Sequence, residues 1–157
     1  MNQSAQIRDL FVGLAMLAMQ VILFRHLQIY GSEPDLVLIY LLWLCTKKNR
    51  TETLIYAAVF GLLQDSMTDL WGLHTFSKTL LIFIAYNYLN KVSENRIILW
   101  QSFLVLLAAA FLHNLIFISL STFVELYSSA LLAWSMLIIG SIYTALIGSF
   151  LYLVRTG

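Results

Sequence analysis

Long apolar segments dominate the chain, and short polar or charged stretches separate them. Six such segments can be drawn, at approximately residues 10–27, 35–46, 53–65, 74–90, 97–120 and 129–154. About 20 helical residues span the ~30 Å hydrocarbon core of a bilayer, and helices inside a bundle can be shorter. The segments lack the alternating pattern of a barrel strand, and backbone polar groups in lipid must be satisfied internally. The pattern therefore predicts an all-α integral membrane protein with six transmembrane helices.

Composition agrees with this interpretation and narrows the range of functions. Of the 157 residues, 61% are apolar or aromatic and 11% are charged, whereas soluble domains have about 25% charged residues. No linker or repeat divides the chain, so residues 1–157 are interpreted as a single polytopic membrane domain. The net charge of +1 gives no basic face of the kind that nucleic-acid binding requires.

The distribution of basic residues predicts the orientation. Basic residues favour the cytoplasmic side of a membrane, and six spans with both termini in the cytoplasm place seven of the nine Lys and Arg residues there. These seven are Arg8, Lys47, Lys48, Arg50, Lys91, Arg96 and Arg155. Arg25 falls on the opposite side, and Lys78 lies within a span. We therefore predict a multi-pass membrane protein with both termini in the cytoplasm.

The second and third segments are shorter than a bilayer requires. Residues 35–46 and 53–65 would extend only about 18–20 Å each as helices. Together they form a hairpin whose basic tip, at residues 47–50, lies at the cytoplasmic surface. The other ends of the two helices, at residues 35 and 65, are then expected to lie below the periplasmic surface of the membrane. Charged backbone segments at that depth must be buried in protein or line a wet cavity.

Polar side chains gather in the half of the predicted bundle that faces the periplasm. Ionisable groups inside a membrane cost several kcal/mol and usually face a partner or water, and His74 and Lys78 share one helix face. We therefore predict a periplasm-facing polar pocket or partner-facing surface. Its candidate residues are Asp35, Gln64, Asp65, His74, Lys78, His113 and Asn114.

Purely structural roles are an open alternative for each of these residues. Lys78 could extend its ammonium group outward to water, and Asp65 could cap or end its helix. His113 and Asn114 could form hydrogen bonds between helices.

Small residues predict where helices pack closely. Gly140, Thr144 and Gly148 recur every four residues in the last segment, and Ala57 and Gly61 share a face with Asp65 in the third. Such small-xxx-small faces let helix backbones approach each other within a membrane.

The sequence contains no motif that indicates catalysis. The HExxH, P-loop, GxGxxG and GxSxG patterns are absent, and the three histidines, at positions 26, 74 and 113, lack metal-ligand spacing. The single Cys45 can form no internal disulfide and is expected to face lipid or to be packed. We therefore expect neither an enzyme nor a bound cofactor or metal.

Three motifs in the middle of the chain resemble a known family. Pro34-Asp35-Leu36 opens a short span, Gly61–Asp65 (Gly-Leu-Leu-Gln-Asp) closes the next, and Gly72–Leu80 (Gly-Leu-His-Thr-Phe-Ser-Lys-Thr-Leu) opens the fourth. Their order and spacing, together with the chain length, are similar to those of the rod shape-determining MreD family. The resemblance covers residues 33–90, and the remaining spans agree in hydrophobicity and placement.

The resemblance implies a fold like the S component of energy-coupling-factor (ECF) transporters. It also implies a non-enzymatic subunit of the bacterial elongation (rod-shape) complex in the bacterial cytoplasmic (inner) membrane. That complex supports peptidoglycan synthesis and maintains cell shape. The implied partners are MreC and, in the same complex, RodA and a class B penicillin-binding protein.

Two other functions are compatible with a small polytopic protein. One is a true S component for vitamin uptake, although the Ala-x-x-x-Ala pattern typical of those proteins is missing, because Met19 follows Ala15 at that spacing. The other is a membrane enzyme on lipid substrates that would use Asp65, Asp69, His74 and Lys78 as acid-base groups.

Overall fold

The computed structural model describes residues 3–94, 99–124 and 130–156. These residues form helices and connecting loops, with no strand among them and one isolated bridge between Ile29 and Ser32. The α-helices are α1 (Gln3–Ile22), α2 (Leu36–Cys45), α3 (Arg50–Thr68), α4 (Leu73–Glu94), α5 (Leu99–Ser121), α6 (Ala130–Ser135) and α7 (Ser141–Thr156). Short 3-10 helices η1 (Phe24–His26) and η2 (Thr122–Val124) and the π-helix η3 (Met136–Gly140) complete the set.

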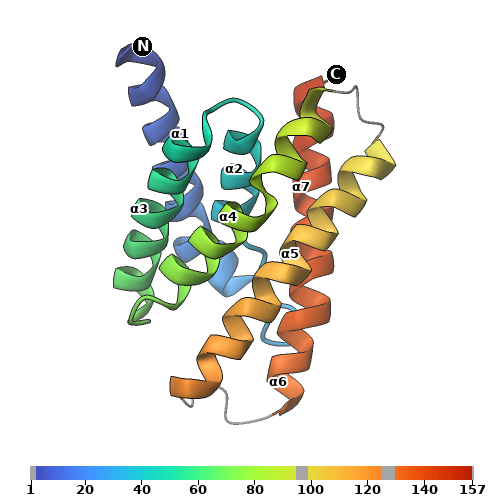
Figure 1. Ribbon diagram of the computed structural model, residues 1–157. Coiled ribbons are helices and arrows are strands. Elements are labelled where there is room, and N and C mark those ends of the chain that lie inside the picture. The colour runs from blue at the N-terminus through green and yellow to red at the C-terminus, as the bar shows by residue number, and fades with distance from the viewer. Residues whose placement is uncertain (1–2, 95–98, 125–129, 157) are drawn as a thin grey trace.

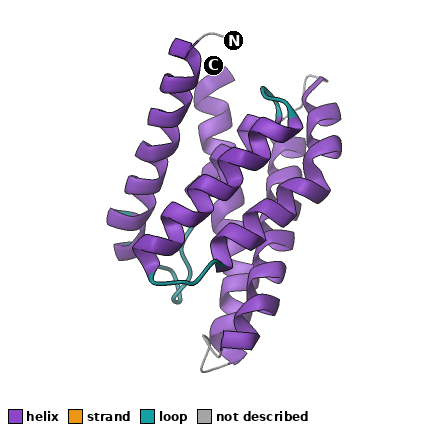
Figure 2. Ribbon diagram, turned by 60° about the vertical axis from the view of Figure 1, so that its left-hand side comes forward, coloured by secondary structure: helices purple, strands orange, loops and turns teal. Residues whose placement is uncertain are grey.

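The helices lie side by side in one bundle whose chain direction alternates. Figures 1 and 2 show both ends of the chain and the α2–α3 connection at one end, and the α3–α4 connection at the other. We call these the terminal end and the opposite end. This alternation is the arrangement that the predicted topology requires. Residue 96 and the predicted span starts at 97 and 129 lie outside the described residues, as does the side chain of Arg155.

Three helical segments among the described residues are long and apolar enough to cross a membrane. They are Gln6–His26, Leu99–Ser121 and Ala130–Val154. Many outward-facing side chains are large and apolar: Phe11, Trp100 and Phe150 are 67%, 65% and 64% exposed. Such a surface suits lipid and not water. The six predicted crossings are thus supported in part, because α2 is apolar but short and α3 and α4 carry more polar residues.

The short helix α2 forms the core of the bundle. Nine of its ten residues are buried, including Cys45, which is packed among apolar side chains. A helix that is apolar on every side is stable only when it is surrounded, and α2 contacts α1, α3, α4, α5 and α7. Its first turn is capped by Asp35, whose Oδ1 accepts a hydrogen bond from the Leu38 N–H at 2.8 Å.

The third helix is longer than its apolar segment suggested. The sequence predicts a span over residues 53–65, whereas α3 runs over 19 residues from Arg50 to Thr68, or about 28 Å. The expectation that both arms of this hairpin are too short is therefore wrong for the second arm. The reason is that polar residues lower the hydropathy of a segment without ending its helix. Thr68, for example, stays in the last turn of α3, and its hydroxyl donates to the Gln64 carbonyl at 2.9 Å. Helix α1 likewise begins at Gln3, before its apolar segment.

Small residues lie at the closest helix contacts. An added Cβ atom at Gly61 would lie 2.5 Å from the Thr75 Cα of α4, and one at Gly148 would lie 2.9 Å from a Leu106 methyl group of α5. Thr144 and Ala57 are both buried. At Gly140 the nearest atom would be at 3.4 Å, an ordinary contact. Helices α3 and α4, and α5 and α7, are accordingly the most extensively packed pairs.

We expect Gly61→Ala to destabilise the protein far more than Gly140→Ala. The new methyl group at position 61 would clash with the Thr75 backbone, which cannot move away as a flexible side chain could. Overpacking of this kind lowers the stability by about 1–3 kcal/mol. Gly140→Ala is the matched control, since both residues lie within helical segments. Thermal unfolding in mild detergent measures the difference, and equal melting temperatures for the two variants would contradict the assigned α3–α4 contact.

Candidate functional site

A buried ion pair lies at the centre of the candidate site. The Lys78 ammonium of α4 donates to Asp35 Oδ2, and the Lys78 side chain has no exposed surface. Asp35 is also buried, and its backbone N–H donates to Thr144 Oγ1 of α7 at 3.0 Å. Lys78 therefore does not extend to the surface, and the pair ties α2 to α4.

Helix α5 contributes two neighbouring polar residues to the same cluster. His113 Nε2 lies 3.8 Å from Asp35 Oδ2 and 3.2 Å from the Ser77 hydroxyl oxygen. His113 Nδ1 lies 3.2 Å from Asn114 Oδ1. The Asn114 amide donates to Ser141 Oγ at 3.0 Å. Each of these groups has a polar partner, as interhelical hydrogen bonding requires.

The same asparagine contacts the π-helix that interrupts the last span. Asn114 Nδ2 donates to the Met136 carbonyl at 3.1 Å, at the start of the segment Met136–Gly140. A π-helix leaves carbonyl groups out of the regular ladder, and such segments are frequent at functional sites. The hydropathy pattern gives no sign of this interruption.

Asp65 joins α3 to the first turn of α4. Its carboxylate accepts hydrogen bonds from the His74 and Thr75 N–H groups, each at 2.9 Å, and from the Thr75 hydroxyl at 2.6 Å. The first N–H groups of a helix have no partner within the helix, and a carboxylate there also favours the helix dipole. Asp65 thus caps a helix that begins eight residues further along the chain.

Gln64 and His74 face each other across the same helix pair. Gln64 Nε2 lies 3.5 Å from His74 Nε2, while Gln64 Oε1 and His74 Nδ1 are buried without a hydrogen-bond partner among the described residues. Buried polar atoms rarely lack partners. Whichever way the Gln64 amide is turned, the two residues together leave one donor and one acceptor unsatisfied.

Three residues of the cluster also have the composition of a metal site. One ligand atom from each of Asp35, His74 and His113 lies within 4.8 Å of the others, and all three residues are buried. Lys78, however, already provides the positive charge beside the Asp35 carboxylate, and a metal cation would have to displace it. The arrangement therefore suits an ion pair with hydrogen-bonding neighbours better than a cation centre.

A polar pocket of about 220 Å³ lies beside the cluster, on the side of the loops at the opposite end. Gln64, Thr68 and His74 line it together with residues of the η1–α2 connection. Burial raises the pKa of Glu33 in this lining, and the nearby Asp35 raises it further. The connection contributes Gln28, Gly31, Ser32 and Glu33, and η1 contributes Arg25.

The fold thus brings together the residues singled out in the sequence. Asp35, Lys78, His113 and Asn114 form one connected network. Gln64, Asp65 and His74 lie at the adjoining α3–α4 contact. In contrast, Asp69 is exposed at the end of α3 with a φ of 55°, and His26 is exposed in η1.

Sequence reasoning missed several residues of the site, among them two hydroxyl side chains of α4 that bond to the predicted residues. Ser77 hydrogen-bonds to His113, and Thr75 hydrogen-bonds to Asp65. Both lie inside the Gly72–Leu80 motif, so the motif itself carried the signal. A single hydroxyl group in an apolar helix is a weak predictor of a site, because it can bond to the backbone of its own helix.

Comparison with known proteins identifies the family. The sequence model of the rod shape-determining protein MreD matches residues 6–154 of the chain. No curated protein and no solved structure matches it. The family match includes all three motifs and every residue of the buried polar cluster. The chain therefore belongs to the rod shape-determining protein MreD family and is a membrane protein that determines cell shape.

Proposed function

We propose that this chain is a non-enzymatic inner-membrane subunit of the bacterial elongation complex. In this role it binds MreC, lies in the same complex as RodA and a class B penicillin-binding protein, and supports peptidoglycan synthesis. The family match across residues 6–154 is the observation that carries the proposal. A fold like that of the S component of ECF transporters is part of the same proposal.

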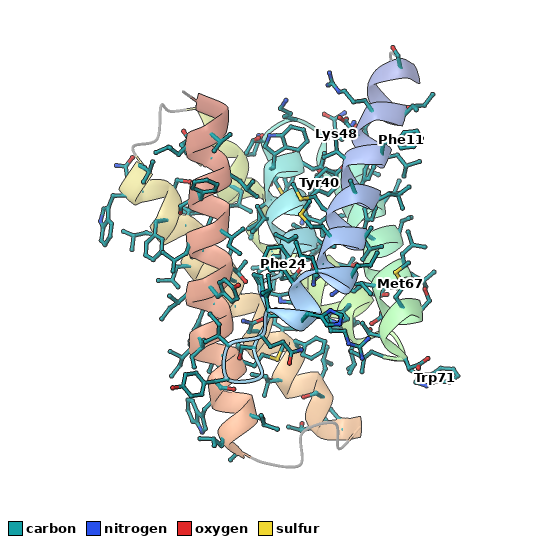
Figure 3. All side chains as sticks on the ribbon, turned by 180° about the vertical axis from the view of Figure 1, so that it is seen from behind. Phe11, Phe24, Tyr40, Lys48, Met67 and Trp71 are labelled. Carbon is teal, nitrogen blue, oxygen red and sulfur yellow. The ribbon has the colours of Figure 1, made fainter. Side chains whose placement is uncertain are left out.

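The proposed topology has six spans and both termini in the cytoplasm. Its support comes from the terminal end of the bundle, where the α2–α3 connection, whose sequence includes Lys47 and Lys48, lies at the same end as both chain ends (Figure 1). Lys48 is labelled there in Figure 3. The loops around the polar pocket, with one basic residue at Arg25, would then face the periplasm.

The polar pocket is the proposed docking site for an extracytoplasmic or juxtamembrane segment of MreC. Its lining combines charged and amide side chains with apolar ones such as Phe117 and Met136. Two of its lining residues, Gln64 and His74, each retain an unsatisfied polar atom among the described residues. The ion pair and the Asp65 cap hold the surrounding helices in place. A rigid surface of this kind favours binding because little freedom is lost on association.

The two other candidate functions have less support. A lipid-directed enzyme would need its acid-base groups together, but Asp69 is exposed while Lys78 is buried against Asp35. For vitamin uptake the favourable observation is the volume of the polar pocket, about 220 Å³. The family match favours the cell-shape role over both.

We expect Thr68→Trp to reduce the amount of MreC that co-purifies with the protein in mild detergent. The indole would fill the pocket that Thr68 lines, and blocking a central binding pocket typically weakens an interface about tenfold or more. Met67→Trp is the matched control, because Met67 is the preceding residue of α3, is 53% exposed and does not line the pocket.

Rod shape in cells that depend on the variant provides a second measurement. The Thr68→Trp cells should round up, and the Met67→Trp cells should stay rod-shaped, at equal amounts of protein in the membrane. Normal MreC recovery with Thr68→Trp would show that MreC does not dock in this pocket. Recovery of a transport ATPase in place of MreC would instead support the vitamin-uptake alternative.

A further inference from the structure

The polar pocket at the opposite end contains a single acidic side chain among its described lining residues, that of Glu33. Glu33 is half-buried in the connection between η1 and α2, and Gln28 of the same connection hydrogen-bonds to its carboxylate. None of the ion pairs among the described residues involves Glu33. Glu33 thus brings to the pocket a carboxylate that has no cationic partner within the described part of the chain.

The charged groups around Glu33 compensate its charge poorly. The Lys78 ammonium is bound to Asp35 and has no exposed surface, so it is already committed to that carboxylate. Arg25 of η1 lines the pocket, but it is exposed, and the charge of an exposed group is screened by the solution. Burial raises the pKa of Glu33, and the negative charge of Asp35 raises it further. The free protein therefore disfavours the ionised form of this side chain, a pattern that is common at functional sites.

The backbone is fixed on both sides of Glu33. Ile29 and Ser32 exchange two N–H···O hydrogen bonds, each at 2.9 Å, which close the turn before Glu33. Two residues after Glu33, the Asp35 N–H donates to Thr144 Oγ1 of α7 at 3.0 Å. A binding group on a rigid backbone loses little freedom when its partner arrives. The Glu33 backbone is therefore in place before the pocket is occupied.

Two buried neighbours in the same lining give a second, independent indication of a ligand. Gln64 is 1% exposed, and neither its Oε1 nor the Nδ1 of His74 has a hydrogen-bond partner among the described residues. Whichever way the Gln64 amide is turned, one of the unsatisfied atoms is an acceptor and one is a donor. A lysine or arginine side chain carries several N–H donors, so it has donors for both Glu33 and that acceptor. The unsatisfied donor requires a carbonyl group, which the backbone of a peptide segment provides.

Other occupants suit these groups less well. An acidic side chain would be repelled by Glu33, because like charges interact strongly where water is partly excluded. A metal cation prefers several carboxylate or carbonyl oxygens, and Glu33 is the one carboxylate in the described lining. A large apolar side chain would leave the unsatisfied atoms of Gln64 and His74 buried without partners.

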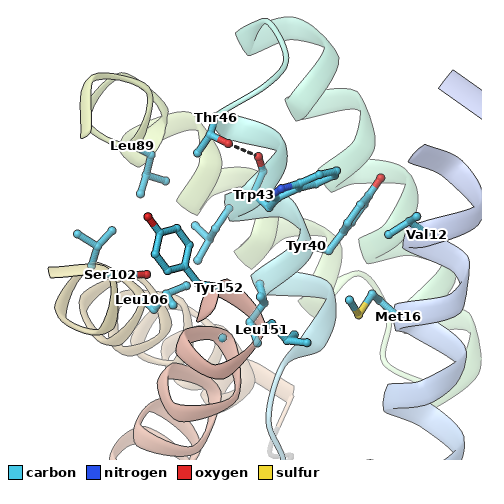
Figure 4. Close-up of a pocket in the computed structure, with 14 residues that line it drawn as sticks. Val12, Met16, Tyr40, Trp43, Thr46, Leu89, Ser102, Leu106, Leu151 and Tyr152 are labelled. Carbon is cyan, nitrogen blue, oxygen red and sulfur yellow. Dashed lines mark hydrogen bonds between the residues drawn. The ribbon is translucent and has the colours of Figure 1, made fainter. Parts of the chain in front are cut away.

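An apolar groove over α2 lacks these features. Figure 4 shows this groove, whose described lining is almost wholly apolar and contains no charged side chain. The hydroxyl group of Thr46 in this groove already donates to the Trp43 carbonyl at 2.7 Å. A charged occupant is therefore expected in the polar pocket and not in this groove.

We infer that Glu33 forms an ion pair with a lysine or arginine side chain of the segment that docks in the polar pocket. The inference rests on the proposed function, in which that segment belongs to MreC, and it names the chemistry that the pocket recognises. The ion pair neutralises a charge that burial disfavours in the free protein. Glu33 therefore selects a basic segment, and its charge destabilises the protein while the pocket is empty.

Binding of purified MreC to the detergent-purified protein near neutral pH tests the ion pair directly. We expect Glu33→Gln to weaken MreC binding about tenfold, because a charge-assisted hydrogen bond in a partly buried site contributes about that factor. The melting temperature of Glu33→Gln without MreC should stay the same or rise, since the neutral amide removes a charge that burial disfavours. Glu52→Gln is the matched control, because Glu52 is also half-buried but lies in the first turn of α3 and does not line the pocket.

A charge exchange tests whether a basic side chain is the partner. Glu33→Lys should weaken MreC binding more than Glu33→Gln does, because it brings two positive charges together. The lysines and arginines of the extracytoplasmic juxtamembrane segment of MreC are then replaced by glutamate, one at a time. One of these MreC variants should bind the Glu33→Lys protein better than unmodified MreC does. Failure of every variant to restore binding would overturn the inference.

Thr68→Trp separates the failure of this inference from the failure of the proposed function. Weak MreC binding in Thr68→Trp with normal binding in Glu33→Gln would mean that MreC docks in the pocket without the ion pair, so only the inference would fail. Normal binding in both variants would mean that MreC docks elsewhere, and both would fail. Equal losses in Glu33→Gln and Glu52→Gln would also overturn the inference, because they would indicate attraction to the net charge alone.

Discussion

Replacing Lys78 by methionine should lower the free energy of unfolding by about 3–5 kcal/mol, the largest loss that we expect from any single substitution here. The change keeps a long apolar side chain but removes the positive charge beside Asp35. That carboxylate would stay buried with His113 as its nearest basic group, 3.8 Å away. An uncompensated charge within a membrane domain is costly, so the variant should accumulate poorly and melt at a much lower temperature in detergent.

The double variant Asp35→Asn with Lys78→Met tests whether the loss in Lys78→Met comes from leaving the Asp35 charge unpaired. It removes both charges, and a neutral pair can replace a buried ion pair at little cost. We therefore expect it to regain most of the stability that Lys78→Met loses. Lys91→Met is the control for loss of a lysine on the same helix, because Lys91 is exposed. If Lys78→Met melted like Lys91→Met, the buried pair would not stabilise the fold.

Asp65→Ala should cost about 2–4 kcal/mol of stability, the second-largest effect. The carboxylate accepts three hydrogen bonds at the beginning of α4, two of them from backbone N–H groups. Alanine would leave those donors without a partner in a buried position, where each lost bond carries its full desolvation cost. The tight contact at Gly61 and Thr75 leaves little room for a replacement water. Thermal unfolding in detergent provides the measurement.

Asp69→Asn is the control for Asp65→Ala. Asp69 lies on the same helix end, is exposed, and has a positive φ that asparagine tolerates. The free energy of unfolding of the Asp69→Asn variant should stay within about 0.5 kcal/mol of that of the parent protein. Equal melting temperatures for the Asp65→Ala and Asp69→Asn proteins would show that the cap contributes little.

These stability effects bear on how function is tested. Asp65 and Lys78 hold the helices together, so a loss of MreC binding in their variants would not distinguish a damaged fold from a damaged docking site. Thr68 lines the pocket without belonging to the ion pair or the helix cap. It is therefore the better position for a functional test.

The sequence by itself determined the class of structure and the family. Hydropathy predicted a helical membrane bundle, because an apolar helix forms all its backbone hydrogen bonds internally, as the lipid environment requires. It also predicted a short second helix and a set of polar residues in one half of the bundle. The residues of the three motifs carry the family resemblance, and the match over residues 6–154 establishes that family.

The tertiary structure alone decided which of those residues meet. Asp35 and Lys78 are 43 positions apart in the chain, and two other basic candidates, His74 and His113, lie close to the same carboxylate. Which of these three basic residues pairs with the Asp35 carboxylate depends on the packing of α2, α4 and α5. The local periodicity of the sequence does not encode that packing. Hydropathy reports how a segment partitions into lipid, so it missed the full length of α3 and the π-helix at Met136–Gly140.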